Sequence, residues 1–268
     1  MAVVTDKRYL TLLALALAGG EPLDGVHLQK AVFLLQNKLP SNVLPRDGYH
    51  FIKHDFGPFD RQIYADAFLF AEQGLAISRG NSRKYEAMSA NEHGKKRAFG
   101  MLEKMPLTVA LWAADIVTWV QSQHFERLVP ALYDEYPTWK ENSKFRGLIN
   151  RFIPHSTPNP APSTRNIPKT HVVDEERVSQ FLEEHPFLLP LVVEARAQLN
   201  KSFPDAQVSL EVSSDPESDE GDENLVLSVQ TDPKRDDALE RLRQFDKSWW
   251  LGKIREAQGM LAITLSYQ

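Results

Sequence analysis

Hydrophobic residues recur at helical spacing through the first forty positions of the chain. The apolar run "RYLTLLALALAGG", residues 8–20, ends at a Gly-Gly pair, and Thr5 or Asp6 can cap its start. A second helix is predicted from Asp24, a good N-cap residue, to Pro40, which cannot continue a helix. The pattern therefore predicts two helices joined by a tight turn.

The pattern changes to alternation in "GYHFIKHDF", residues 48–56, which predicts a short extended segment. One side of this segment carries Tyr49, Phe51 and Lys53, and the other carries His50, Ile52 and His54. Gly57 and Pro58 are then expected to form a turn that leads into the next helix.

That third helix is predicted over residues 60–73, with Asp60 as its N-cap and Gly74 at its C-terminal end. The segments "LAISR" and "KYEAMS" follow, joined by "GNSR", and predict a β-hairpin. Three helices and a hairpin are the order of a winged helix. Residues 107–151 are expected to be mostly helical and to complete the core of this domain.

Two stretches, "HLQKAVFLLQ" and "KHDFGPFDRQIYADAFLFAEQGLAI", resemble the SocA-like (Panacea) antitoxin domain and its winged-helix relatives. In that family an "LQK" helix precedes a Tyr/Phe-Gly-Pro turn and an "IY" helix that ends before "GL". The matching positions are Leu28, Gln29, Lys30, Phe56, Gly57, Pro58, Ile63, Tyr64, Gly74 and Leu75. The resemblance covers about residues 8–90, with a weaker echo at 132–145. It implies an antitoxin-like role in a toxin-antitoxin system, with a cognate toxin as protein partner and DNA binding as a further activity.

A segment with five prolines, "PHSTPNPAPSTRNIPKT", spans residues 154–170 and predicts a stiff linker. The expected domains are therefore residues 1–153, winged-helix-like and mostly helical, and residues 171–268. The second domain has two helical patterns, two alternating strands, a charged helix and the closing strand "GMLAITLSY". It is predicted to be an acidic α+β domain with at least three strands, so the whole chain is of the mixed α+β class.

Composition places the 268-residue chain among soluble globular proteins, with 42% hydrophobic and 25% charged residues. The absence of cysteine excludes disulfides and thiolate chemistry and fits a reducing, cytoplasmic location. The first apolar run, with Ala16-Leu17-Ala18, imitates a signal peptide, but the amphipathic helix after it favours a packed domain. No apolar stretch approaches the roughly 20 residues needed to span a bilayer, so no membrane partner is expected.

Charge is divided unevenly along the chain. Residues 1–155 carry 19 Lys and Arg against 16 Asp and Glu, a net +3, whereas residues 156–268 carry 12 against 20, a net −8. Double-stranded DNA would therefore contact the N-terminal part. The candidate DNA-binding residues are Arg61, Gln62, Arg79, Arg83, Lys84, Lys95, Lys96 and Arg97. The alternative is that these cations are simply solvated, and the acids Asp60, Asp66 and Glu72 weaken the third helix as a reader of bases.

The cluster "KHDFGPFD" offers histidines and acids but no catalytic arrangement. In an extended segment His50 and His54 lie roughly 13 Å apart, too far to share a metal ion. His54 and Asp55 point in opposite directions, and no serine or cysteine nucleophile is nearby. We expect no catalytic residue, no metal and no cofactor, and the oligomeric state stays open.

The acidic stretch "SSDPESDEGDEN", residues 213–224, fails as a calcium loop because the sixth position counted from Asp215 is Glu220 and not glycine. A solvated loop is favoured, with an acidic lure for a basic partner as the alternative. Trp249 and Trp250 are candidate partner-binding residues, although one of them is expected to complete the core.

The leading hypothesis is a non-enzymatic regulator that binds a partner protein. The alternative is a metal-dependent, nuclease-like enzyme that uses Asp215, Asp219 and Asp222.

Overall fold

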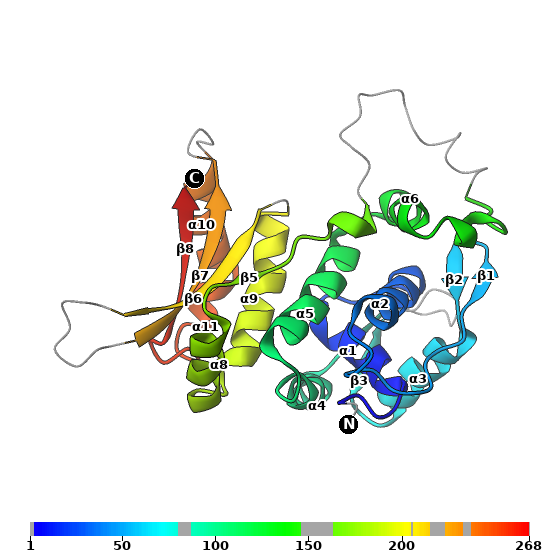
Figure 1. Ribbon diagram of the computed structural model, residues 1–268, viewed down its shortest axis with the longest axis horizontal. Helices are drawn as coiled ribbons and strands as arrows, with labels where there is room; N and C mark the ends of the chain where they lie inside the picture. Colours follow the sequence, from blue (N-terminus) through cyan, green and yellow to red (C-terminus); the bar gives the residue numbers. More distant parts are fainter. Residues whose placement is uncertain are drawn as a thin grey trace. The chain divides into compact units, whose positions relative to one another are not determined.

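The protein combines helices with several small β-sheets, which confirms the mixed α and β class (Figure 1). The computed structural model describes residues 3–79, 87–145, 163–204, 206–214, 223–232 and 237–267.

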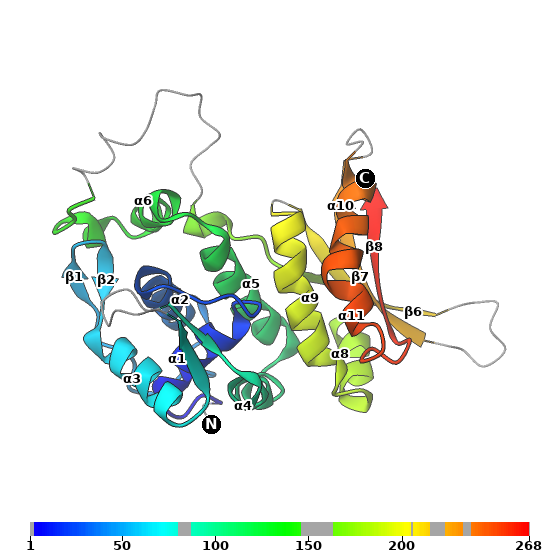
Figure 2. The same cartoon turned by 180° about the vertical axis from the view of Figure 1, so that it is seen from behind.

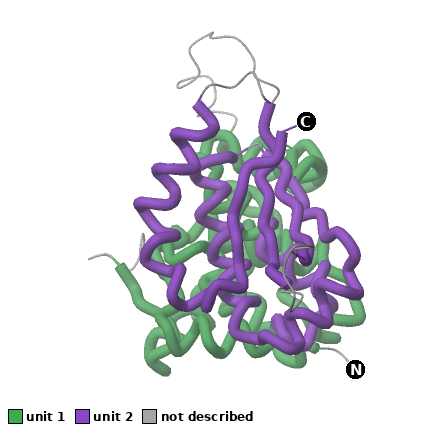
Figure 3. The backbone as a smooth tube through the Cα atoms, turned by 90° about the vertical axis from the view of Figure 1, so that its left-hand side faces the viewer, with its two compact units in different colours: residues 1–101, 116–167 green, residues 102–115, 168–268 purple. Residues whose placement is uncertain are grey.

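The chain divides into two compact units (Figure 3). Unit 1 comprises residues 1–101 and 116–167, and unit 2 comprises residues 102–115 and 168–268. The division falls inside the helix α5 (Leu107–Ser122), so one helix supplies residues to both units. The domain boundaries drawn at 153 and 171 stay a prediction; the units add that residues 102–115 group with the C-terminal residues.

Unit 1 is built around α1 (Arg8–Leu17), whose residues from Leu10 to Leu17 are all buried. The helix α2 (Gly25–Lys38) begins where the Asp24 carboxylate accepts hydrogen bonds from the N–H groups of Val26 and His27. The helix α3 (Arg61–Glu72) begins at Asp60, whose carboxylate accepts from the Gln62 N–H. The predicted N-caps Asp24 and Asp60 are therefore confirmed. The prediction of Thr5 or Asp6 as the N-cap of the first helix is wrong, because α1 has Lys7 at that position, with no side-chain cap hydrogen bond.

Between α2 and α3 lies a small antiparallel hairpin of β1 (Ile52–His54) and β2 (Gly57–Phe59). The predicted alternation is confirmed, because His50, Ile52 and His54 are exposed whereas Tyr49 is buried. The predicted Gly57-Pro58 turn is wrong. The chain turns at Asp55 and Phe56, and Gly57 and Pro58 pair within β2 opposite His54 and Lys53.

The second hairpin of unit 1 consists of β3 (Ala76–Arg79) and β4 (Ala87–Ala90), paired antiparallel. The "GNSR" turn expected between them, residues 80–83, lies outside the described residues. An isolated bridge joins Leu23, between α1 and α2, to Met88 of β4. The remaining elements of unit 1 are α4 (Glu92–Leu102), the second half of α5, α6 (Phe125–Glu135) and the short turns η1 (Pro137–Lys140) and η2 (Thr164–Asn166).

Unit 2 holds a mixed sheet that, in its described residues, has the strand order β5-β6-β7-β8. The strands are β5 (His171–Val172), β6 (Val208–Ser214), β7 (Glu223–Thr231) and β8 (Leu261–Tyr267). β6 and β7 are antiparallel, whereas the β5–β6 and β7–β8 pairs are parallel. The prediction of at least three strands is therefore met.

The helices of unit 2 cover one face of this sheet (Figures 1 and 2). They are α8 (Glu175–Glu184), α9 (Leu188–Ser202), α10 (Ala238–Phe245), the π-helical turn η3 (Asp246–Trp250) and α11 (Leu251–Lys253). The covered face carries alternate buried residues of the two central strands: Val208, Leu210, Val212, Leu225, Leu227 and Val229.

A buried ion pair ties α5 to α9 within unit 2. Arg196 Nε lies 2.9 Å from Asp115 Oδ1, and the two side chains are 3% and 1% exposed. The second carboxylate oxygen accepts from the Thr170 N–H at 2.6 Å. Residues 102–115 are thus joined to the rest of unit 2 by charge as well as by packing.

Candidate functional site

Gln29 and Lys30 of α2 bind the backbone of Asp60 and Pro58 in unit 1. Gln29 lies on α2 and is 1% exposed. Its side-chain amide donates to the carbonyl oxygen of Asp60 at 2.8 Å and accepts from the N–H of Asp60 at 3.0 Å. One amide thus satisfies both backbone groups of the residue that caps α3, which fixes the start of that helix relative to α2.

Lys30, the next residue, is 2% exposed, and its amine donates to the carbonyl oxygen of Pro58 at 2.9 Å. Burial lowers the pKa of this amine to about 7, because a charged group is costly to remove from water. Lys30 therefore serves as a hydrogen-bond donor that fastens β2 to α2.

Gly57 has a backbone conformation that favours glycine at this position. Its φ is +98°, in the region that favours glycine. A Cβ at this position would lie 3.2 Å from Cε1 of Tyr133, which belongs to the echo at 132–145. The strand β2 thus packs directly on α6 at this position.

Gly74 and Leu75 close the motif at the end of α3. Gly74 has a φ of +68°, and its carbonyl accepts from the Asn91 side chain at 2.8 Å. The Leu75 carbonyl accepts from the Asn91 N–H at 3.1 Å. These bonds hold the start of α4 against the end of α3.

The outward side of the hairpin carries apolar and aromatic side chains, and Tyr64 of α3 adjoins them. We call this set the hairpin face: Ile52, His54, Phe59 and Tyr64. Ile52 is 59% exposed and lies opposite Phe59 in the strand register. The His54 ring stacks on Phe59 with centroids 4.6 Å apart, and Phe59 meets Tyr64 edge to face at 5.7 Å. His54 is thus a surface residue beside an exposed isoleucine.

Behind the hairpin face lies a buried polar network that the sequence pattern did not reveal. The Tyr49 hydroxyl donates to Asp66 Oδ2 and contacts the Thr11 hydroxyl, both at 2.7 Å. Asp66, counted above as an acid on the third helix, is 2% exposed. Its other oxygen accepts from the Gln62 amide at 2.9 Å. A polar residue at a core-facing helical position, three residues after Ile63, was the available signal.

The candidate DNA-binding residues lie on three elements. Arg61 and Gln62 begin α3, Arg79 ends β3, and Lys95, Lys96 and Arg97 lie on α4. Arg83 and Lys84 lie outside the described residues.

Several of these side chains are already engaged. Gln62 is bound to Asp66, Lys95 lies 3.0 Å from Glu92, and Arg97 donates to the Tyr9 hydroxyl at 2.6 Å. Arg61, Arg79 and Lys96 are exposed. The cations best placed to meet a phosphate backbone are therefore these last three.

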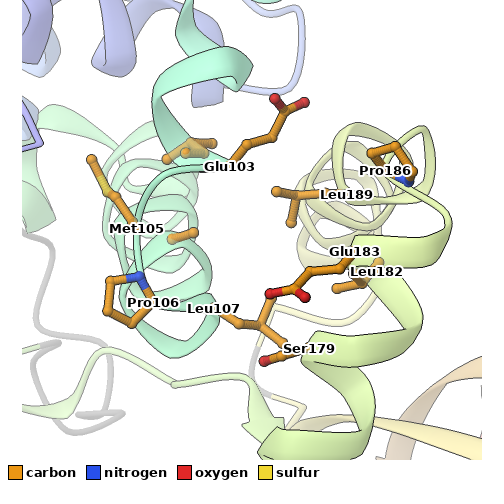
Figure 4. A pocket seen from close by; sticks show the side chains of 11 residues that line it. Glu103, Met105, Pro106, Leu107, Ser179, Leu182, Glu183, Pro186 and Leu189 are labelled. Carbon is orange, nitrogen blue, oxygen red and sulfur yellow. The ribbon is translucent and has the colours of Figure 1, made fainter.

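Unit 2 contains a cavity of about 350 Å³ between α8–α9 and residues 102–110. Figure 4 shows Glu103 and Glu183 on opposite walls. The rest of the lining is mainly apolar: Leu102, Met105, Pro106, Leu107, Ala110, Leu182, Pro186 and Leu189. An apolar cavity with two carboxylates suits a ligand that has an apolar body and a positive charge. No local pattern predicts this cavity, because its walls are some 70 residues apart in the chain.

The tryptophan pair is divided as expected. Trp250 is 7% exposed, and Trp249 is half-buried against Phe245 with ring centroids 5.6 Å apart. Asp215, Asp219 and Asp222 lie outside the described residues, as does most of the acidic stretch.

The described residues bear on two further properties, metal binding and membrane crossing. No group of three or more His, Asp or Glu side chains among them is arranged to hold a metal ion. In the same parts of the chain, no helix is both long enough and apolar enough to cross a membrane.

Comparison with family models, with curated proteins and with solved structures finds no match for this chain.

Proposed function

We propose that the protein is a non-enzymatic, antitoxin-like regulator that binds a partner protein through the hairpin face of unit 1. The observation that carries this proposal is that buried side chains of α2 hold the hairpin in place. The side chains of Gln29 and Lys30 form hydrogen bonds with the backbone of Asp60 and Pro58. They hold up a hairpin whose outward side exposes Ile52.

We infer that unit 1 is winged-helix-like, with β3 and β4 as the wing. The order α1, α2, α3, β3, β4 supports this, as does the bridge between Leu23 and Met88, which adds a third segment beside β4. The hairpin of β1 and β2 is an addition between α2 and α3.

The chemistry of the hairpin face favours a protein partner. Exposed isoleucine beside stacked aromatic rings offers apolar surface at a position fixed by its own backbone hydrogen bonds. Such preordered aromatic and aliphatic groups contribute most of the affinity at protein interfaces. DNA binding through Arg61, Arg79 and Lys96 is the second activity that we propose, and Trp249 remains a candidate contact in unit 2.

The cavity in unit 2 is a second candidate contact for a protein partner. Glu103 and Glu183 would pair with a Lys or Arg that flanks an apolar side chain. Of the two, Glu183 lies in the C-terminal part of the chain, which has a net negative charge.

The test is co-expression with the product of the neighbouring gene in the native host. We expect the two proteins to co-purify and the full-length chain to relieve any growth defect that the neighbour causes. Ile52→Asp should lower the recovered partner at least about tenfold, because a carboxylate would have to be buried in the interface.

Ile77→Asp is the matched control, since Ile77 is a 44% exposed strand residue outside the hairpin face. It should bind as the wild type does. A wild-type chain that neither recovers its neighbour nor alters growth would contradict the proposed function, and equal losses in both variants would contradict the proposed surface.

A further inference from the structure

The strand β8 forms an edge of the sheet in unit 2. It pairs with β7 along its whole length, from Leu261 opposite Leu225 to Tyr267 opposite Thr231. In the described part of the chain no strand lies on its other side. The opposite edge, β5, is only two residues long.

The sequence of β8, "LAITLSY", has none of the features that usually protect an edge strand. It contains no charged residue, no proline and no glycine. Long, uncharged edges of this kind are templates for pairing with another strand. A protein that keeps such an edge has a use for it or is prone to aggregate.

The backbone direction of β8 shows which groups the edge offers. The Leu225 N–H donates to the carbonyl of Met260, so the even-numbered residues of β8 turn their backbone groups toward β7. The odd-numbered residues turn theirs outward: Leu261, Ile263, Leu265 and Tyr267. The side chains of these same residues continue the apolar face of the sheet.

The burial of this apolar row decreases along the strand. Leu261 is 5% exposed, Ile263 and Leu265 are half-buried, and Tyr267 is 58% exposed. Their neighbours on β7, Leu225, Leu227 and Val229, are completely buried. The helices therefore cover the centre of the sheet and leave its β8 edge incompletely covered.

We propose that β8 pairs antiparallel with β8 of a second copy of this chain, about a two-fold axis at Thr264. This register opposes Leu261 to Tyr267 and Ile263 to Leu265. In this register all seven residues of β8 are paired. The apolar rows of the two copies lie on the same face of the joined sheet, and the outward backbone groups of one copy form hydrogen bonds with those of the other.

The strand's composition favours a second copy over another protein's strand. An uncharged sequence pairs with itself without repulsion, and Thr264 meets Thr264, a favourable cross-strand pair. Helix α10, which lies against β8, carries Leu239 at 50% exposure and leads to Leu251 at 59%. These residues offer further apolar area, because the strands alone are small for a stable interface.

The experiment measures the mass of the full-length chain by sedimentation over a range of concentrations. The wild type should form a concentration-dependent dimer. Thr264→Lys and Thr264→Glu should each raise the dimer dissociation constant about tenfold or more, because like charges would face each other at the axis. An equimolar mixture of the two variants should dimerise again.

Ser213→Lys, at an exposed position of β6 in the same sheet, is the matched control and should leave the dimer unchanged. Circular dichroism of each variant checks that the fold is retained. A wild-type chain that stays monomeric would overturn the proposal, as would a dimer that Thr264→Lys does not weaken or a mixture of variants that stays monomeric. Loss of binding to a different protein in Thr264→Lys, with a monomeric wild type, would assign the edge to that partner instead.

Discussion

Lys30 is a buried lysine of α2 whose pKa is lowered by its surroundings. Its amine is buried and meets the Pro58 carbonyl, and burial lowers its pKa to about 7. The unfolded chain binds this proton up to a pKa near 10.4. Folding therefore releases a proton between about pH 7 and pH 10, and the free energy of unfolding should rise with pH across that window.

Replacing Lys30 by methionine should remove this dependence. In the wild type we expect Lys30 to add about 2 kcal/mol to the free energy of unfolding between pH 7.5 and pH 9.5. Lys30→Met should have a flatter profile, because no proton is released at this position when it folds. Urea denaturation at several pH values measures the difference.

The control is Lys104→Met, which changes an exposed lysine and should keep the wild-type profile. A Lys30→Met profile as steep as that of the wild type would show that the buried amine stays charged in the folded protein.

At the scale of single elements, α4 contains two glycines with opposite demands. A Cβ on Gly94 would lie 2.0 Å from the Leu75 carbonyl oxygen, a backbone atom that cannot move away. A Cβ on Gly100 would have no other atom within 4 Å. The close approach at Gly94 lets α4 pack directly on the end of α3.

Alanine at these two positions should therefore have opposite effects on stability. Gly94→Ala should lower the free energy of unfolding by roughly 2 kcal/mol or more through overpacking. Gly100→Ala should raise it by about 0.5–1 kcal/mol, because glycine is a poor helix former. Thermal unfolding of both variants measures the contrast, and a stabilising Gly94→Ala would contradict the close packing of α4.

The elements also show how far local patterns predict this fold. The caps at Asp24 and Asp60, and the alternation from Tyr49 to His54, depend on near neighbours, and the sequence predicted them. The predicted Gly57-Pro58 turn was wrong because both residues pair across the hairpin, with His54 and Lys53. Those contacts are set by packing, which a local pattern does not contain.

At the scale of the whole molecule, the charge difference between the two parts of the chain leads us to expect that the affinity for DNA depends on the salt concentration. If the N-terminal part contacts a duplex, the affinity should fall as the salt concentration rises. In a plot of the logarithm of the association constant against the logarithm of the salt concentration, each phosphate contact should add about 0.9 to the downward slope. Combined replacement of Arg61, Arg79 and Lys96 by glutamine should reduce that slope by about 2–3. Fluorescence anisotropy with a labelled duplex at several salt concentrations measures it.

The matched control removes the same charge from Lys104, Arg127 and Lys140, which are also exposed. It should keep the wild-type slope. Equal losses in both triple variants would indicate that net charge, and not the three proposed residues, causes binding.

The candidate sites at this scale were only partly predictable. The motif residues were singled out in the sequence because they form short runs of neighbouring positions that resemble a known family. The cavity beside Glu103 and Glu183 and the ion pair of Asp115 with Arg196 were not, because distant segments form them. A hydrophobic pattern reports which side of a helix faces inward but not which other helix it meets.

The contribution of residues 102–115 to unit 2 has a consequence for its inheritance. A genetic exchange that moved only residues 168–268 into another protein would bring Arg196 without the Asp115 carboxylate that pairs with it. It would also expose to water the part of unit 2 that residues 102–115 cover, and the apolar area exposed there would lower the stability of the transferred segment. We therefore expect recombination to transfer unit 2 together with the first half of α5, and not residues 168–268 alone.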